Sequence, residues 1–133
     1  MSEENVDVLR RAYEAFARDD VDGILPLLDE HIEWRNPEDS PVAGVWHGHQ
    51  GVRDWFAQTR ESLGEMWFEP EEFVELPDGR VFVLARGGFR APQSGVEMEY
   101  PLANLITLRD GLVTRFQMYS DLGRARQVAG LEE

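Results

Sequence analysis

The sequence predicts an α+β fold in which helices pack against one face of a curved, largely antiparallel sheet. In the N-terminal part of the chain, hydrophobic residues recur every three or four positions, which is helical spacing. In the C-terminal part, four strand-like runs follow one another. Helices gathered beside antiparallel strands are typical of α+β domains. A curved sheet with helices laid across it leaves a cone-shaped cavity, and such cavities usually hold ligands.

The N-terminal elements follow from periodicity and from capping residues. A first helix is expected to begin at Ser2, because apolar residues recur on one helical face as far as Phe16. Asp20 can cap a second helix, which Pro26 keeps short or kinks because proline lacks an amide donor. The run over residues 31–36 alternates and stops before a proline, which predicts a strand.

A long loop then leads into a third helix, predicted over residues 51–63. The strand-like runs that follow cover residues 66–76, 80–90, 96–108 and 112–120. The segments PDG at 77–79 and RDG at 109–111 predict tight turns that join the first pair and the last pair as hairpins. Asp121 is expected to cap a closing helix.

Composition narrows the classes of function. The 133 residues, 42% of them hydrophobic, suffice for a core, and we expect residues 1–133 to form a single domain. The net charge of −13 argues against nucleic acid and anionic membranes as partners. The sequence has neither a signal-peptide pattern nor about 18 uninterrupted apolar residues that could span a membrane. The absence of cysteine excludes a disulfide scaffold and a cysteine nucleophile, and favours a cytoplasmic protein.

The segment GVWHGHQGV, at residues 44–52, raises the question of a metal site. His47 and His49 supply two ligands, which do not fill a tetrahedral site, and His31 is not an obvious third. A phosphate-binding loop is not expected either, because the spacing differs and no lysine follows. We therefore predict a turn without a metal, in which His49 is a candidate contact at the rim of a pocket.

The order of the elements and five segments resemble the nuclear-transport-factor-2-like superfamily, and within it the SnoaL-like, ketosteroid-isomerase-like branch. The segments are YEAFARDDVDGILPLLDEHIEW, GHQGVRDWF, SGVEMEY, LITLRDGLVTRF and YSDLGRARQVAGL. The resemblance implies a cystatin-like α+β roll, in which a curved mixed sheet wraps around three to four helices and a cone-shaped pocket. This fold hosts isomerases, cyclases, epoxide hydrolases, dehydratases and non-catalytic binding domains, so it does not determine the activity.

The resemblance places no isomerase chemistry at the three positions that ketosteroid isomerases use. The catalytic base falls on Asn36, the hydrogen-bonding acid on Asn104, and the tyrosine on Ala12. Tyr13 lies one step away and is therefore expected to be turned by about 100° around the helix. Because an amide cannot abstract a proton, isomerase activity is not expected. The arginine and aspartate of the related epoxide hydrolases fall on Leu102 and Asn104, so that reaction is not expected either.

The SnoaL-type cyclases of this branch rely on one acidic residue near the pocket. Asp121, just after the last predicted strand, is the candidate catalytic residue of this chain. Its alternative role is structural, because SDLGRAR reads as a helix start and aspartate is a preferred cap.

The pocket is expected to be lined by aromatic and polar side chains from several elements. Alternation places Tyr100, Leu102 and Asn104 on one face of their strand. The resemblance implies that Arg115, Gln117 and Tyr119, at alternate positions of the last strand, face the pocket. Arg86 interrupts an apolar run and either reaches a ligand or faces solvent. The candidate ligand-binding residues are Trp34, Asn36, Trp55, Phe56, Trp67, Tyr100, Leu102, Asn104, Arg115, Gln117 and Tyr119.

The other face of the last strands also carries apolar residues and is expected to be covered. Leu105, Phe116 and Met118 are assigned to this face, and the resemblance suggests that a second subunit packs on it to form a homodimer. The function expected is that of a SnoaL-like protein that binds or converts a hydrophobic, oxygenated molecule such as a polyketide-like or steroid-like ring. An enzyme of this kind would isomerise, cyclise or hydrate without a cofactor. The alternative is a non-catalytic ligand-binding or accessory domain.

Overall fold

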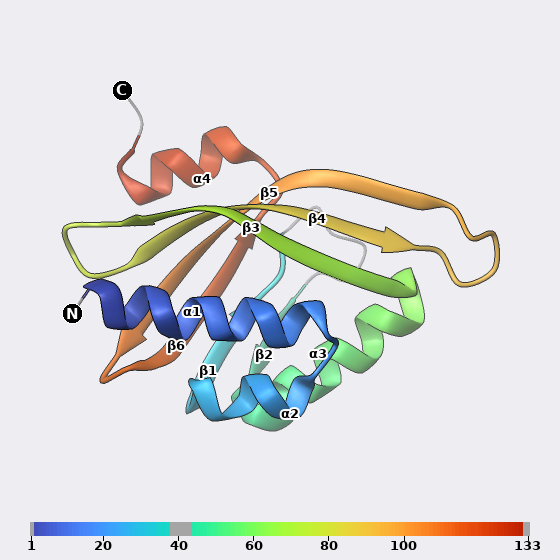
Figure 1. Ribbon diagram of the computed structural model, residues 1–133, viewed down its shortest axis with the longest axis horizontal. Helices are drawn as coiled ribbons and strands as arrows, with labels where there is room; N and C mark the ends of the chain where they lie inside the picture. Colours follow the sequence, from blue (N-terminus) through green and yellow to red (C-terminus); the bar gives the residue numbers. More distant parts are fainter. Residues whose placement is uncertain (1, 38–43, 132–133) are drawn as a thin grey trace.

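A computed structural model describes residues 2–37 and 44–131, which form a curved six-stranded sheet and four α-helices (Figure 1). The helices are α1 (Ser2–Ala17), α2 (Val21–Ile24), α3 (Gly48–Leu63) and α4 (Leu122–Ala129), with a short 3-10 helix, η1, over Leu25–Leu27. The strands are β1 (Leu28–Arg35), β2 (Val45–His47), β3 (Glu65–Glu75), β4 (Val81–Arg90), β5 (Glu97–Arg109) and β6 (Leu112–Tyr119).

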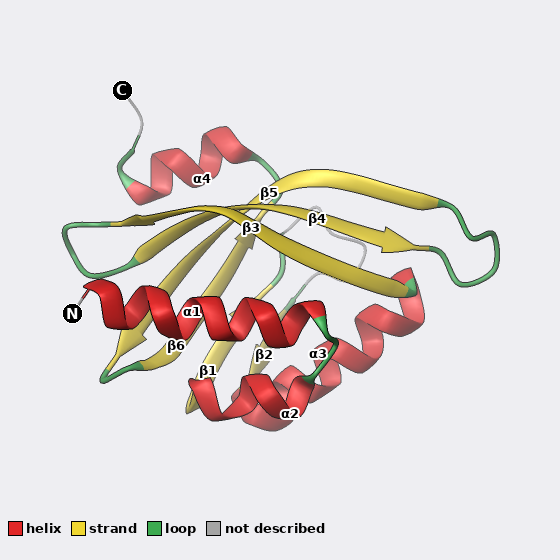
Figure 2. Cartoon of the chain, viewed as in Figure 1, coloured by secondary structure: helices red, strands yellow, loops and turns green. Residues whose placement is uncertain are grey.

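The sheet is mixed, with the strand order β2-β1-β6-β5-β4-β3. Strands β1 and β6 pair in parallel, whereas the other four strand pairs of the described chain are antiparallel. Helices α1 and α3 lie on the concave side of the sheet and α4 on the opposite side (Figure 2). The predicted α+β fold with a curved mixed sheet is therefore confirmed.

The predicted elements and turns form, with one addition. Both expected hairpins are present, and Asp110 and Gly111 have φ values of 54° and 80°, the left-handed geometry of a tight two-residue hairpin turn. The segment predicted as a loop and turn before the third helix instead supplies strand β2, and α3 already begins at Gly48. None of the helices in the described ranges has the length and apolar character needed to cross a bilayer.

The concave face of the sheet holds the larger core. Trp34 of β1 stacks on Phe116 of β6 with ring centroids 4.2 Å apart, and Phe16 of α1 packs against Trp34 at 6.1 Å. Aromatic side chains contribute large buried areas, so this stack fixes α1 across the centre of the sheet. The described part of β6 therefore directs its apolar side chains inward, towards the helices.

This arrangement corrects the surface predicted for a homodimer. Phe116 and Met118 lie on the concave face and are buried within the chain, so they cannot form a subunit interface there. Leu105 does face the convex side, but it packs in a second cluster with Ala125 and Ala129 of α4. The physical reason is alternation: a strand shows its more apolar side to the core, and here that side carries residues 116 and 118.

Candidate functional site

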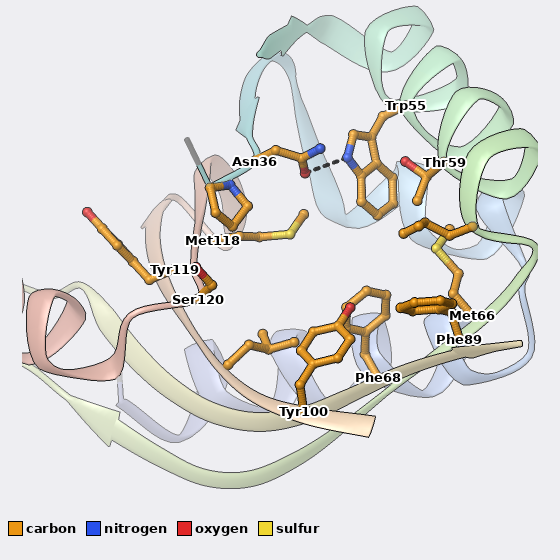
Figure 3. A pocket seen from close by; sticks show the side chains of 13 residues that line it. Asn36, Trp55, Thr59, Met66, Phe68, Phe89, Tyr100, Met118, Tyr119 and Ser120 are labelled. Atoms are coloured by element: carbon orange, nitrogen blue, oxygen red, sulfur yellow. Dashed lines mark hydrogen bonds between the residues drawn. The ribbon is translucent and has the colours of Figure 1, made fainter. Parts of the chain in front are cut away.

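A cavity of about 230 Å³ lies between α3 and the concave face of the sheet (Figure 3). Its lining is mainly aliphatic and aromatic, drawn from α3 and from strands β3 to β6. Phe68 and Phe89 close one side, and Trp55 of α3 lies on the other. The structure thus contains the kind of apolar enclosure that usually binds small molecules.

Asn36 and Trp55 join the end of β1 to helix α3 at one wall of the cavity. The indole Nε1 of Trp55 donates a hydrogen bond of 2.7 Å to Oδ1 of Asn36, and both residues are buried. The strand stops at Arg35 because Pro37, two positions later, cannot continue the ladder. Asn36 is therefore held at the strand end, where its amide forms part of the cavity wall.

Thr59 adds a second polar group to the same wall. It follows Trp55 by four positions, so both side chains project from one face of α3. Its hydroxyl is buried and makes no hydrogen bond with the described residues. A buried hydroxyl without a partner is costly, which makes Thr59 a group that a ligand oxygen could satisfy.

Tyr100 of β5 stands on the opposite wall and points its hydroxyl into the cavity (Figure 3). Partial burial raises the pKa of Tyr100 above its usual value, because the phenolate would lose solvation. The tyrosine therefore keeps its proton at neutral pH and can donate a hydrogen bond into the cavity.

A second, more polar chamber of about 360 Å³ adjoins the cavity. The two share Pro37, which follows β1, and Met118, Tyr119 and Ser120 at the end of β6. The outer chamber adds Asp121 and Arg124, and also the predicted site residue Gln117. The two spaces therefore meet near the ends of β1 and β6.

Asp121 caps helix α4, as the structural alternative predicted. Its Oδ1 accepts a hydrogen bond of 3.1 Å from the backbone N–H of Arg124. Aspartate at this position satisfies one of the amides that a helix start leaves open. Asp121 also lines the outer chamber, and a chemical role for it stays a prediction.

The structure brings together about half of the predicted ligand-binding residues. Those that line the inner cavity are Asn36, Trp55, Tyr100, Leu102 and Tyr119. Figure 3 shows the side chain of Tyr119 directed away from the centre of the cavity. Trp34, Phe56 and Asn104 are buried in the core and do not line it.

Two further predicted residues, Arg115 and Trp67, lie on the convex face. Arg115 pairs with Glu33 at 3.2 Å, outside the cavity. Trp67 lies opposite Gly88, and its indole covers that glycine. Neither residue lines the cavity, because side chains alternate between the two faces of the sheet and the inward positions beside them are taken by Phe68 and Phe116.

Sequence reasoning missed several cavity residues that simple patterns could have found. Helical spacing from Trp55 points to Thr59, and inward apolar alternation on the last strand points to Met118. The other lining residues that were not predicted are Pro37, Leu63, Met66, Phe68, Phe89 and Ser120. Several of these are ordinary core residue types, which carry no signal of a site in the sequence.

Tyr13 and Asn104 form a buried pair outside the cavity. Nδ2 of Asn104 donates a hydrogen bond of 2.6 Å to the hydroxyl of Tyr13, which joins β5 to α1. Tyr13, expected to be turned by about 100° from the position of Ala12, is buried against the sheet, and Ala12 is partly buried beside it. Burial raises the pKa of Tyr13 far above its usual value. Oδ1 of Asn104 has no hydrogen-bond partner among the described residues.

The histidines and Arg86 lie away from the cavity. The ring Nε2 of His49 is 3.0 Å from the carbonyl oxygen of Leu28, which ties the start of α3 to β1. His47 pairs with Glu33 in the β1–β2 register. Within the described ranges no cluster of three potential metal ligands is found. Arg86 is exposed and lies 3.7 Å from Glu71 and 3.9 Å from Glu99, which supports the solvent-facing alternative.

The model of the SnoaL-like domain matches residues 9–116, most of the chain. The chain belongs to the SnoaL-like family. The nuclear-transport-factor-2-like character predicted from the sequence is supported by a structural relative that is 28% identical, and the fold is shared with a protein that has a ketosteroid isomerase-like fold.

This SnoaL-like chain is similar to three proteins of different description. The protein TerC, crystallised with polyporic acid, is 27% identical with a TM-score of 0.80, and the match covers 96% of this chain and 98% of TerC. A nuclear-transport-factor-2-like protein of Burkholderia xenovorans is 28% identical with a TM-score of 0.69, over 96% of this chain and 95% of its own. An uncharacterized protein of Mycobacterium tuberculosis is 29% identical over 119 residues, covering 88% of this chain and 89% of that protein.

Proposed function

We propose that this SnoaL-like protein binds a small, mainly apolar ring compound with oxygen substituents, in the cavity between α3 and the sheet. The observation that carries the proposal is the lining of the cavity. Aromatic and aliphatic side chains enclose it, while the polar groups of Asn36, Thr59 and Tyr100 stand on its walls. Small-molecule sites combine these two features, because apolar contact supplies affinity and a few polar groups fix orientation.

The dimensions of the site support a ligand of modest size. The inner cavity, at about 230 Å³, lies somewhat below the range of roughly 300–1,000 Å³ that is usual for drug-sized ligands. The outer chamber, a second and more polar pocket of about 360 Å³, shares lining residues with it at the end of β6. A compound of a few rings with polar substituents therefore suits the site. TerC, a 27% identical relative, was crystallised with polyporic acid, which makes this compound a reasonable first probe.

Catalysis on the bound ligand is the second candidate, and the position of Asp121 favours it. Its carboxylate lines the outer chamber, next to the residues that this chamber shares with the cavity. An acid–base cyclisation or isomerisation would use this group on a substituent reaching the outer chamber. Asp121→Asn is the matched test, because asparagine preserves a cap acceptor while removing the acid. Turnover that survives this change would exclude Asp121 as the acid–base group.

Binding is tested by calorimetric titration with polyporic acid. We expect saturable binding by the wild type and about tenfold weaker binding by Asn36→Leu, because Trp55 then loses its acceptor and the cavity wall its amide. Asn5→Leu, on helix α1, is the matched control and should bind like the wild type. Equal affinity of the wild type and Asn36→Leu would place the binding site elsewhere, and absence of binding would count against polyporic acid-like ligands.

A further inference from the structure

Two consecutive glycines of β4 make room for ring side chains on opposite faces of the sheet. A Cβ atom on Gly88 would lie 2.4 Å from the indole of Trp67, on the convex face. A Cβ atom on Gly87 would lie 2.5 Å from Cδ2 of Leu102 and 3.1 Å from the ring of Tyr100, on the concave face. Because carbon atoms do not approach so closely, only glycine permits either arrangement.

Gly87 therefore allows Leu102 and the ring of Tyr100 to lie close against β4. The two residues are direct partners in the β4–β5 register, and without a side chain on Gly87 the tyrosine ring can lie against the strand. From this position the hydroxyl points into the cavity, towards the wall formed by α3 (Figure 3). The Tyr100 hydroxyl makes no hydrogen bond with the residues in the described ranges.

Tyr100 faces a wall on which Thr59 carries the other hydroxyl without a hydrogen bond to the described residues, and Tyr100 is the donor on the β5 side of the cavity. Oδ1 of Asn36 already accepts the indole N–H of Trp55. The raised pKa of Tyr100 means that its hydroxyl keeps its proton well above neutral pH. A donor aimed into an apolar enclosure discriminates strongly between ligands, because a ligand without an acceptor leaves the hydroxyl desolvated and unpaired.

We propose that Tyr100, positioned by Gly87, selects ring compounds that carry a carbonyl-type acceptor oxygen on the edge facing β5. This inference rests on the proposed function and names the ligand class of the same cavity. Tyr100 donates to the ligand oxygen, and the surrounding apolar side chains contact the ring. Gly87 acts through Tyr100 and is a positioning residue.

The test uses two probes that differ by a single carbonyl group, 1-tetralone and tetralin, with affinities measured by ligand-observed NMR. We expect Tyr100→Phe to bind 1-tetralone about fivefold more weakly while its affinity for tetralin is unchanged or slightly higher. The ratio of the two affinities reports the hydrogen bond separately from apolar binding. A merely structural role of Tyr100 would weaken both probes equally.

The glycines provide the matched pair of variants. Gly87→Ala should displace Tyr100 and Leu102 into the cavity and reduce the affinity for both probes. Gly88→Ala introduces the same methyl group one position away, displaces Trp67 on the convex face, and should leave the affinity ratio as in the wild type. Circular dichroism confirms that each variant is folded.

The outcomes separate the two proposals. If the wild type binds tetralin and Tyr100→Phe leaves the affinity ratio unchanged, the cavity binds ligands but Tyr100 does not select them, and the inference is overturned. If the wild type binds neither probe, nor polyporic acid, the proposed function fails and this inference fails with it. If Gly87→Ala does not fold, Tyr100→Phe alone decides the question.

Discussion

Two buried asparagines on the concave face make similar hydrogen bonds but lie in different surroundings. Asn36 accepts from the indole of Trp55 and lines the cavity. Asn104 donates to the hydroxyl of Tyr13 and has no access to the cavity. Met118, which is paired with Asn104 in the β5–β6 register, also lines the cavity and so marks its boundary on this side.

The comparison shows that the same amide group has a different role on each side of Met118. A buried amide needs a hydrogen-bond partner in either place, so the need for a partner does not identify a site. Asn104 joins helix α1 to β5, whereas Asn36 holds Trp55 in the cavity wall. A buried asparagine therefore belongs to a binding site only where its amide borders a cavity.

Met118→Ala should have the largest effect, because it removes the boundary between the two amides. Shortening a buried methionine leaves a void, and we expect the free energy of unfolding in urea to fall by about 3 kcal/mol. The enlarged cavity should then reach Asn104, so its side-chain amide NMR signal should shift when polyporic acid is added. The same signal should stay fixed in the wild type and in Met66→Ala, which shortens a different wall. A fixed signal in Met118→Ala would mean that other atoms seal Asn104.

Tyr13→Phe should have the next largest effect, and on stability alone. The variant leaves the amide of Asn104 buried without its partner, which costs about 2 kcal/mol of unfolding free energy. The double variant Tyr13→Phe/Asn104→Leu should regain most of this loss, because both polar partners are then replaced by apolar groups. Ligand affinity should remain that of the wild type in both. A tenfold loss of affinity would show that the pair belongs to the site.

Alkaline pH should lower the free energy of unfolding gradually, by a smaller effect that comes from the buried Tyr13. The folded state raises the pKa of Tyr13 above the ordinary 10.0, so above pH 10 the unfolded chain binds fewer protons than the folded one. The stabilisation is therefore complete below pH 10 and is lost as the pH rises further, at about 1.4 kcal/mol per pH unit for one tyrosine. Urea unfolding between pH 9 and 11 measures this slope. Tyr13→Phe should reduce it, and an unchanged slope would assign it to other groups.

The fold could be predicted because its signals are local and repeated. Helical periodicity, capping residues and the two hairpin turns each determine a short segment, and their order leaves few α+β arrangements. Strand β2 could not be found this way, because its three residues become a strand only by pairing with β1. The strand therefore depends on contacts with a distant part of the sequence. Gly44 and Gly48, which flank it, indicate a turn instead.

The site was harder to predict because it depends on which side chains of each strand point to the concave side of the sheet. The predicted facing of β6 was reversed, which turned Arg115 inward and Phe116 outward. Chain alternation determines which residues share a face, but not which face is concave. The Trp34–Phe116 stack decides that question, and it joins two distant parts of the sequence. The role of Gly87 was equally hidden, because it depends on ring atoms of the neighbouring strand.

The parallel pairing of β1 with β6 has a consequence for the order of folding. Hairpins β3–β4 and β5–β6 connect near neighbours in the sequence and can form early, whereas β1 must wait for a strand that comes far later. Asn36 directly follows β1, so the part of the cavity wall that it forms should be completed in the slow phase of refolding. The binding cavity would then be among the last parts of the molecule to form, and recovery of ligand binding would report the final step of folding.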